Sequence, residues 1–248
     1  ILRHKMRAFL TTLGIIIGVA SVVTMVSLGN GATASIQEEV SSLGANMLTI
    51  QPGQGFGQGG GKAPPPFQMD DVNAIRLQIA GLRTVAPITS IQAVAVFEAN
   101  NWQTSVNGTT NEYFLASNLE MAEGRLFSES ELMAGKSVCI IGDTLRSKLF
   151  RNTTAIGKSL RLRDISCKII GVLDKKGQSG FGQDPDDQVV LPLKTAMRRL
   201  NGNQNVQRIQ VAVDERFDSG VVSNTITALL REHRHLLRGM EADFIIFD

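Results

Sequence analysis

The chain has 248 residues, of which 43% are hydrophobic, 19% charged and 5% aromatic, with a formal net charge of +2. A chain of this length can form one large domain or two small ones around a sizeable core. The near-neutral balance lacks the basic stripe of a nucleic-acid-binding surface, so the composition excludes that class of partner.

Residues 8–29 carry no charged side chain. As a helix rising about 1.5 Å per residue, this segment would cross a hydrocarbon core of about 30 Å. Basic residues lie just before it, between positions 3 and 7, and no lysine or arginine follows until Lys62. The positive-inside rule therefore assigns residues 1–30 to a cytoplasmic flank and a first transmembrane helix, with the rest of the chain outside the cytoplasm.

Two alternatives to a membrane anchor exist for this segment. A cleaved signal peptide also starts with basic residues, but its apolar core spans about 7–15 residues and ends at a small-residue cleavage site. A helix buried in a soluble domain would show one polar face. The transmembrane interpretation explains the segment better than either.

The next part of the chain alternates between helical and extended patterns. A stalk helix is predicted over 31–44 and ends at a glycine, which suits a helix C-terminus. A strand, a Gly/Pro-rich loop, a helix and a hairpin turning at Asn100–Asn101 should follow, over 45–53, 53–66, 69–79, and 84–97 with 102–107.

The middle and end of the chain differ in pattern. The middle is rich in strands, with helical turns at 111–118, 128–135 and 144–150, and strands at 137–143, 158–174 (around a turn at Asp164) and 187–192. The end is simpler: a strand at 206–214, an amphipathic helix over 218–237 with Val222, Ile226, Leu229 and Leu230 on one face, and a strand at 242–248. The fold class is therefore α+β, with one lobe from 31–107 and 203–248 and an inserted β-rich lobe over 108–202.

Glycine-rich motifs provide no nucleotide site. The glycines of 53–61 are followed by Pro64 to Pro66, which cannot open the helix that a dinucleotide fingerprint needs. Gly-Lys-Ser triplets occur at 135–137 and 157–159, but the upstream glycine of a P-loop is missing from both. We therefore expect this chain alone to bind no ATP.

Polar clusters provide no catalytic or metal set either. Asp70 and Asp71 are interpreted as charges at a helix start, and the acidic loop 184–187 lacks the spacing of a calcium loop. His233 and His235 should point to different faces of a helix, as solvated surface. The sequence thus predicts no catalytic, cofactor-binding or metal-ligating residue, and nothing specific supports a glycosidase-like acid pair.

The two cysteines, Cys139 and Cys167, lie in apolar strand-like runs without the spacing of a metal or redox motif. We predict that they are unpaired and behave as small buried hydrophobes. A disulfide between them remains possible outside the cytoplasm.

An ordered set of segments resembles MacB-type ABC transporter permeases. LRHKMRAFLTTLGIIIGVASVVTMVSLGNG resembles their first transmembrane segment, and LGANMLTIQPG resembles the strand after their stalk helix. NEYFLASNLEMAEGRLFSESE is similar to their Y-F…L-x-x-G-R-x-F stretch, here with Tyr113, Phe114, Gly124, Arg125 and Phe127. SVCIIGDTLRSKLF followed by AIGKSLRLRDISCKIIGVLDKKG is similar to their strand, helix and hairpin signature.

The resemblance implies a porter-like α+β lobe with an inserted β-rich lobe. It further implies a bacterial inner-membrane protein, crossing once in this chain, with its bulk in the periplasm. The expected partners are a second permease subunit, an ABC domain (fused or separate) that holds ATP and magnesium, a MacA-like membrane fusion protein and a TolC-like outer-membrane channel. The implied function is efflux of macrolides, peptides or similar molecules, driven mechanically by ATP hydrolysis and relevant to antibiotic resistance.

Alternatives within the same topology are a lipoprotein-releasing LolC/LolE-like permease and an FtsX-like regulatory permease. An alternative of another class is a single-pass, membrane-anchored sensor or adhesion domain. The loop 53–66 is richer in glycine than the family suggests, and we interpret it as a flexible loop or a contact to the adaptor.

Overall fold

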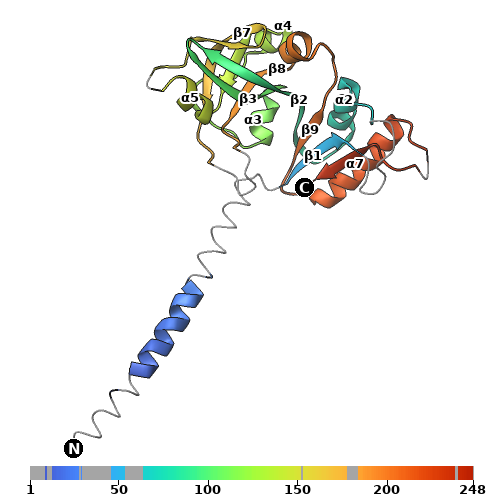
Figure 1. The fold of residues 1–248 in the computed structure, drawn as a ribbon. Coiled ribbons are helices and arrows are strands. Elements are labelled where there is room, and N and C mark those ends of the chain that lie inside the picture. The colour runs from blue at the N-terminus through green and yellow to red at the C-terminus, as the bar shows by residue number, and fades with distance from the viewer. Residues whose placement is uncertain are drawn as a thin grey trace, which may run out of the picture. The chain divides into compact units, whose positions relative to one another are not determined.

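The computed structural model describes most of the chain, in these ranges: 9, 13–27, 29, 46–53, 64–151, 153–177, 184–237 and 240–247. The chain separates into two compact units, Ile1–Ala45 and Asn46–Asp248 (Figure 1).

The first unit contains a helix over 13–27 with exposed apolar side chains; Ile15 and Val22 are each 62% exposed. Within the described ranges, no helix has both the length and the apolar character needed to cross a bilayer. The transmembrane helix expected over 8–29 therefore stays a prediction. The stalk expected over 31–44 lies outside the described residues.

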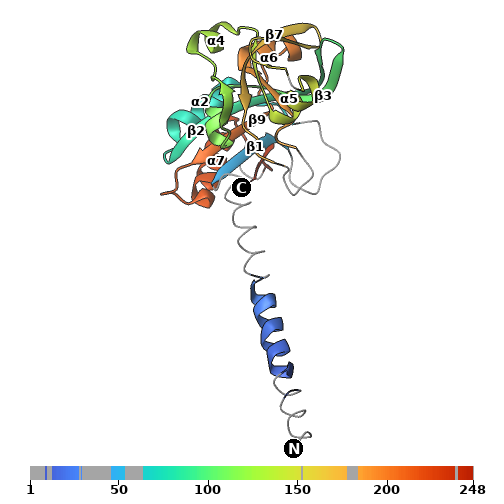
Figure 2. The same cartoon turned by 90° about the vertical axis from the view of Figure 1, so that its left-hand side faces the viewer.

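The second unit begins with an open, four-stranded antiparallel sheet, in the order β10-β1-β9-β2. Figure 2 shows β1 and β9 side by side in it. Its elements are β1 (Met47–Pro52), α2 (Met69–Gln78), β2 (Leu82–Phe97), β9 (Arg208–Val213), α7 (Ser219–His233) and β10 (Phe244–Phe247). This succession and order match the ferredoxin-like split β-α-β arrangement.

The two helices of this sheet begin at clear capping signals and pack against each other. Gln68 and Asp71 form a capping box at the start of α2, and the Asp218 carboxylate accepts the Val221 N–H at 2.9 Å at the start of α7. Val222, Ile226 and Leu230 of α7 are buried in the core of the open sheet, as predicted. The capping and the apolar face together explain why the sequence is helical here.

The strand β2 continues beyond the open sheet into a closed barrel of six strands, in the order β2, β3, β8, β5, β7 and β6, with β6 pairing back onto β2. Pairs β3–β8 and β5–β7 are parallel, and the other neighbours are antiparallel. The strands are β3 (Asn100–Thr109), β5 (Val138–Ile141), β6 (Ser159–Leu162), β7 (Ile165–Leu173) and β8 (Gln188–Pro192), and β4 (Met121–Gly124) is added at β7.

Short helices cover the barrel: α3 (Glu112–Ala116), α4 (Glu129–Ala134), α5 (Asp143–Leu149), α6 (Leu193–Ala196) and the π-helical turn η1 (Met197–Asn201). Leu145 and Leu149 of α5 are buried in the barrel core. Next to them, the rings of Phe97 and Phe150 have centroids 4.2 Å apart. A closed sheet with a filled interior leaves little room for a ligand among its strands.

One local expectation needs correction. The hairpin joining β2 and β3 turns at Glu98 and Ala99, not at Asn100–Asn101, because Glu98 takes the positive φ of 51° and Asn100 already pairs with Phe97. The lobe boundaries expected at residues 107 and 202 stay a prediction, since β2 belongs to both sheets and one residue cannot divide them.

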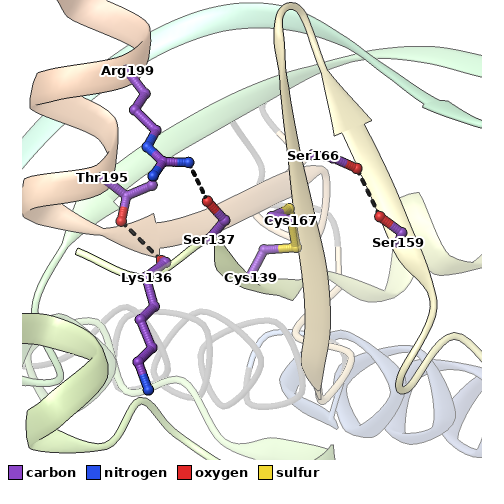
Figure 3. The surroundings of a disulfide bond; sticks show 8 residues. All are labelled: Lys136, Ser137, Cys139, Ser159, Ser166, Cys167, Thr195 and Arg199. Carbon is purple, nitrogen blue, oxygen red and sulfur yellow. Dashed lines mark hydrogen bonds between the residues drawn. A yellow bond between two sulfur atoms is a disulfide. The ribbon is translucent and has the colours of Figure 1, made fainter. Parts of the chain in front are cut away.

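The prediction of two unpaired cysteines is wrong. Cys139 of β5 and Cys167 of β7 are joined by a disulfide, with Cα atoms 5.8 Å apart (Figure 3). The two strands are parallel neighbours, so side chains on the same face come within bonding range. Both residues are buried, as expected, but as a bonded pair in the barrel core.

Candidate functional site: the joint between the open sheet and the barrel

The chain passes from the open sheet to the barrel within two residues of β2. Ile88 makes the last pair with β9, opposite Arg208, and Thr89 makes the first pair with β3, opposite Gly108. We call this crossing, with the side chains that bridge it, the joint. One continuous strand therefore carries the ladder hydrogen bonds of both sheets.

Hydrogen bonds to the backbone of β2 stabilise the crossing from both of its edges. The Gln207 N–H donates to the carbonyl of Ile88 at 2.9 Å, and the Gln207 side-chain oxygen accepts the Ser90 N–H at 2.9 Å. The buried hydroxyl of Thr109 donates to the carbonyl of Pro87 at 2.8 Å. These bonds satisfy backbone groups that the change of sheet would otherwise leave unpaired.

A buried polar chain runs from the joint into the barrel. The Asn107 amide donates to the Gln188 side-chain oxygen at 3.0 Å, and the Tyr113 hydroxyl donates to that oxygen, also at 3.0 Å. Burial raises the pKa of Tyr113, so its phenol stays neutral and keeps the proton that it donates. Buried polar groups satisfied in this way specify one arrangement of the strands.

A glycine allows the tight approach of α6 to the joint. A Cβ on Gly108 would lie 2.2 Å from the Cβ of Ala196 and 2.9 Å from Cγ2 of Thr89. The side-chain amide of Asn201, at the end of η1, donates a hydrogen bond to the Thr89 hydroxyl. The helical turn after β8 is therefore packed directly against the crossing point.

A second link joins the barrel to the open sheet through α3. The Ser117 hydroxyl donates to the side-chain oxygen of Gln210 in β9 at 3.0 Å, and the Lys176 ammonium donates to the Ser117 carbonyl at 2.8 Å. Burial lowers the pKa of Lys176, while the charge of Asp186 opposes that shift. The Asp186 carboxylate also accepts the backbone N–H groups of Lys176 and Gly177.

The family-signature residues build structure around α4. Gly124 has a φ of +84°, and a Cβ there would lie 2.2 Å from the Ile170 carbonyl oxygen. Arg125 donates two hydrogen bonds of 2.8 Å to the Glu131 carboxylate, which also accepts the Ser128 N–H. These contacts, chiefly the bond from Arg125, lower the pKa of Glu131 to about 2. The motif therefore fixes the start of a helix.

A buried ion network joins the two helices of the open sheet. Asp71 accepts from Arg234 at 3.2 Å and lies 3.0 Å from the His233 ring nitrogen. Arg234 also contacts Asp243 at 2.8 Å and lies over the Phe67 ring. His233 is exposed, as expected of helix surface, but its ring nitrogen lies against the buried Asp71 carboxylate, because the C-terminus of α7 meets the N-terminus of α2.

His235 does not share a helix with His233 either. It lies beyond the end of α7, with a φ of +55°. Asp70, by contrast, lies in the first turn of α2, as expected of a charge at a helix start.

The carboxylates of the acidic loop 184–187 accept hydrogen bonds from side chains of neighbouring elements. Asp184 accepts the Thr144 hydroxyl at 2.7 Å, and Asp187 accepts the indole N–H of Trp102 at 3.1 Å. In the part of the chain that the structure describes, no three His, Cys, Asp or Glu residues are grouped to hold a metal ion.

The Gly-Lys-Ser triplets also have local structural roles. Gly135 ends α4 with a φ of +62°. Ser137 accepts from Arg199 at 2.7 Å, and Ser159 is bonded to Ser166 at 2.7 Å (Figure 3). Both triplets lie at the boundaries of strands in the barrel.

Sequence reasoning missed the joint. Its only signal is the presence of the polar residues Asn107, Gln188 and Gln207 within or beside predicted strands. Polar residues at such positions need partners. The partners come from β3, β8 and the segment before β9, which are far apart in sequence, so the pattern alone could not connect them.

These features define a class: an α+β domain in which an open ferredoxin-like sheet carries an inserted, closed barrel on a shared strand. The family model of the MacB-like periplasmic core domain matches residues 8–229. The chain belongs to this family, as a MacB-like periplasmic domain of an ABC transporter permease.

Relatives and solved structures agree with this assignment. The chain is 34% identical to the macrolide export ATP-binding/permease protein MacB of Bdellovibrio bacteriovorus, over 99% of the chain and 38% of that protein. It is 36% identical to the MacB protein of Chlorobium phaeobacteroides, over 96% of the chain and 37% of that protein. The chain thus spans well under half of these relatives.

The fold is that of solved transporter domains. The periplasmic region of MacB from Actinobacillus actinomycetemcomitans matches with a TM-score of 0.72 and 22% identity, covering 86% of this chain and 94% of that one. The extracellular domain of the noncanonic ABC-type transporter YknZ from Gram-positive bacteria matches with a TM-score of 0.64 and 17% identity, over 82% of this chain and all of that one.

Proposed function

We propose that this chain is the periplasmic domain of an inner-membrane exporter and passes motion from a cytoplasmic ABC domain to the exported molecule. The ABC domain, fused or separate, would bind ATP and magnesium. The segment 8–29 would anchor the domain by a single transmembrane helix in this chain. Macrolides, peptides or similar molecules are the proposed substrates, supported by the name of the MacB relatives.

The joint is the observation that carries this proposal. A displacement applied to the open sheet reaches the barrel through the continuous strand β2, whose ladder continues across Ile88 and Thr89. Bending the crossing would break the bonds of Gln207 and Thr109, each worth about 1 kcal/mol net. The two lobes therefore move together more readily than they move apart.

The proposed partners follow from the family. Two permease subunits would pair, and their periplasmic domains would meet a MacA-like membrane fusion protein that leads to a TolC-like outer-membrane channel. The fold shared with a Gram-positive transporter domain favours a second candidate, a permease of this fold that works without an outer-membrane duct.

The test uses the full-length transporter in a host without other macrolide pumps, with ATP hydrolysis and macrolide tolerance measured together. Two matched variants of β3 separate coupling from folding. Thr109→Val removes the bond to Pro87, whereas Thr104→Val alters an equally buried hydroxyl that has no hydrogen-bond partner. We expect Thr109→Val to keep ATP hydrolysis and lose part of the tolerance, and Thr104→Val to keep both.

Other results would contradict specific parts of the proposal. Wild-type protein that hydrolyses ATP without raising macrolide tolerance would exclude macrolides as substrates. A defect in lipoprotein release or in cell-wall cleavage instead would favour the LolC/LolE-like or FtsX-like alternative. A gene that encodes no further membrane spans would favour a sensor or adhesion domain. Equal ATP hydrolysis and equal macrolide tolerance in the two variants would show that the Thr109 bond at the joint does not take part in coupling.

A further inference from the structure

The disulfide lies inside the barrel. Cys139 is 0% exposed and Cys167 is 1% exposed, and both belong to the apolar core that fills the six strands. Lys136, Ser137, Ser159 and Ser166 lie nearby on the same strands or next to them (Figure 3). The bond is thus enclosed by the sheet whose strands it connects.

Enclosure restricts when the bond can be made. A disulfide forms when a thiolate attacks a sulfur of another disulfide, through a mixed disulfide. The oxidant's sulfur must touch the attacking sulfur, and a sulfur with no exposed surface cannot be reached from solvent. In the closed barrel, neither Cys139 nor Cys167 can make that contact.

The ladders β2–β6 and β5–β8 are the shortest of the barrel, with two registered pairs each, and β2–β6 is the seam that closes the ring. Strands β2 and β6 are registered only at Ala95↔Leu162 and Val96↔Arg161, whereas β2 and β3 pair from Thr89 to Phe97. The Arg163 guanidinium adds one bond across the seam, to the Gln92 carbonyl at 3.1 Å. Strand β6 also lies directly beside Cys167, which pairs with Leu160. A chain with β6 detached from β2 is therefore open next to the disulfide.

We propose that an extracytoplasmic thiol–disulfide oxidoreductase, in its disulfide form, installs this bond while the β2–β6 seam is open. The thiolate of one cysteine attacks the enzyme's disulfide and forms a mixed disulfide, releasing one enzyme thiol. The thiolate of the second cysteine then attacks the mixed disulfide at the sulfur of the first, releasing the other enzyme thiol. Two electrons and two protons pass from Cys139 and Cys167 to the enzyme, which leaves as a dithiol.

This inference goes beyond export. It rests on the periplasmic placement of the family, where oxidation is favoured, and not on the transported molecule. It makes the chain a folding substrate of a redox enzyme, with oxidation preceding closure of the barrel.

The first test compares oxidation of open and closed forms of the full chain. The chain is reduced and unfolded in urea, and one half is refolded in reductant, with folding followed by the fluorescence of its one tryptophan, Trp102. The bacterial oxidoreductase in its disulfide form is added to both halves, and free thiols are counted by maleimide mass tagging. We expect the refolded half to be oxidised about 100-fold more slowly, because only its rare open form reacts.

The seam is tested with two arginine variants of the refolded, reduced chain. Arg163→Ala removes the bond across the seam and should speed oxidation severalfold. Arg161→Ala changes an exposed arginine two residues earlier, in β6, whose backbone pairing with Val96 stays in place; it is the matched control, with an unchanged rate expected. Equal rates for unfolded and refolded wild type would overturn the proposal. A reduced chain that fails to refold would support it, since oxidation must then come first.

A test in cells asks whether a periplasmic thiol oxidase is needed to form the disulfide. The full-length protein is pulse-labelled in hosts with and without the periplasmic thiol oxidase, and free thiols are trapped in acid at intervals. Retention of both thiols in the deficient host is expected. Bond formation at the same rate in both hosts would show that no such enzyme acts, and would overturn the assignment of the oxidant.

Discussion

The ion pair between Arg125 and Glu131 makes a pH-dependent contribution to the free energy of unfolding, and Glu131→Gln would remove that contribution. The carboxylate is 9% exposed and accepts two hydrogen bonds of 2.8 Å from Arg125, so its pKa falls from 4.5 to about 2. Each pKa unit corresponds to about 1.4 kcal/mol, which sets an upper limit of about 3.4 kcal/mol. Arg125 is 54% exposed, and solvent screening reduces the figure to about 1–2 kcal/mol.

The sign follows from the lowered pKa. An unfolded Glu131 has a pKa near 4.5, so the folded chain holds fewer protons below that pH. The contribution is fully present above about pH 4.5 and is lost as the pH falls toward about 2. Glu131→Gln should therefore destabilise the chain by about 1–2 kcal/mol at pH 7, and the difference from wild type should shrink with acidification.

Urea unfolding measured from pH 7 to pH 3, by circular dichroism and by Trp102 fluorescence, tests this prediction. Glu129→Gln is the control, because Glu129 is an exposed acid in the same helical turn, and it should change stability little at any pH. A difference between wild type and Glu131→Gln that stays constant with pH would refute the reasoning, since it would show a packing effect and not a charge effect.

Three further outcomes are expected. Replacing Cys139 and Cys167 by alanine should lower the free energy of unfolding by about 3–4 kcal/mol, given their separation of 28 residues, as measured by urea titration. Thr109→Val should cost about 1 kcal/mol by the same titration, while Thr104→Val costs nothing or stabilises the chain. Asp71→Asn should cost about 1–3 kcal/mol, seen as a lower melting temperature, because the buried Arg234 guanidinium loses one of its two carboxylate partners and keeps only Asp243.

The sequence was most informative where one local pattern decides the structure. The spacing of Val222, Ile226 and Leu230 predicted α7, and alternation predicted β9 and the β2–β3 hairpin. The fold class followed from the order of these elements, together with the family resemblance.

Long-range neighbours could not be predicted in the same way. Cys139 and Cys167 look like two ordinary core residues until β5 and β7 are known to be parallel neighbours. The contact of the exposed His233 with Asp71 could not be predicted until α2 is known to lie against the end of α7. In each case the missing information was which strand or helix lies beside which, and residue periodicity carries no such information.

The position of the barrel in the chain explains how the open sheet tolerates it. Ile88 and Arg208 face each other at the end of the β2–β9 ladder, where an uninterrupted ferredoxin-like unit would have a short hairpin turn. The barrel occupies the place of that turn. Its chain leaves the open sheet after Ile88 and returns before Arg208, and these two residues are paired with each other. Because the entropy of closing a loop grows only slowly with length, a whole lobe can sit there at little expense to the four strands beneath it.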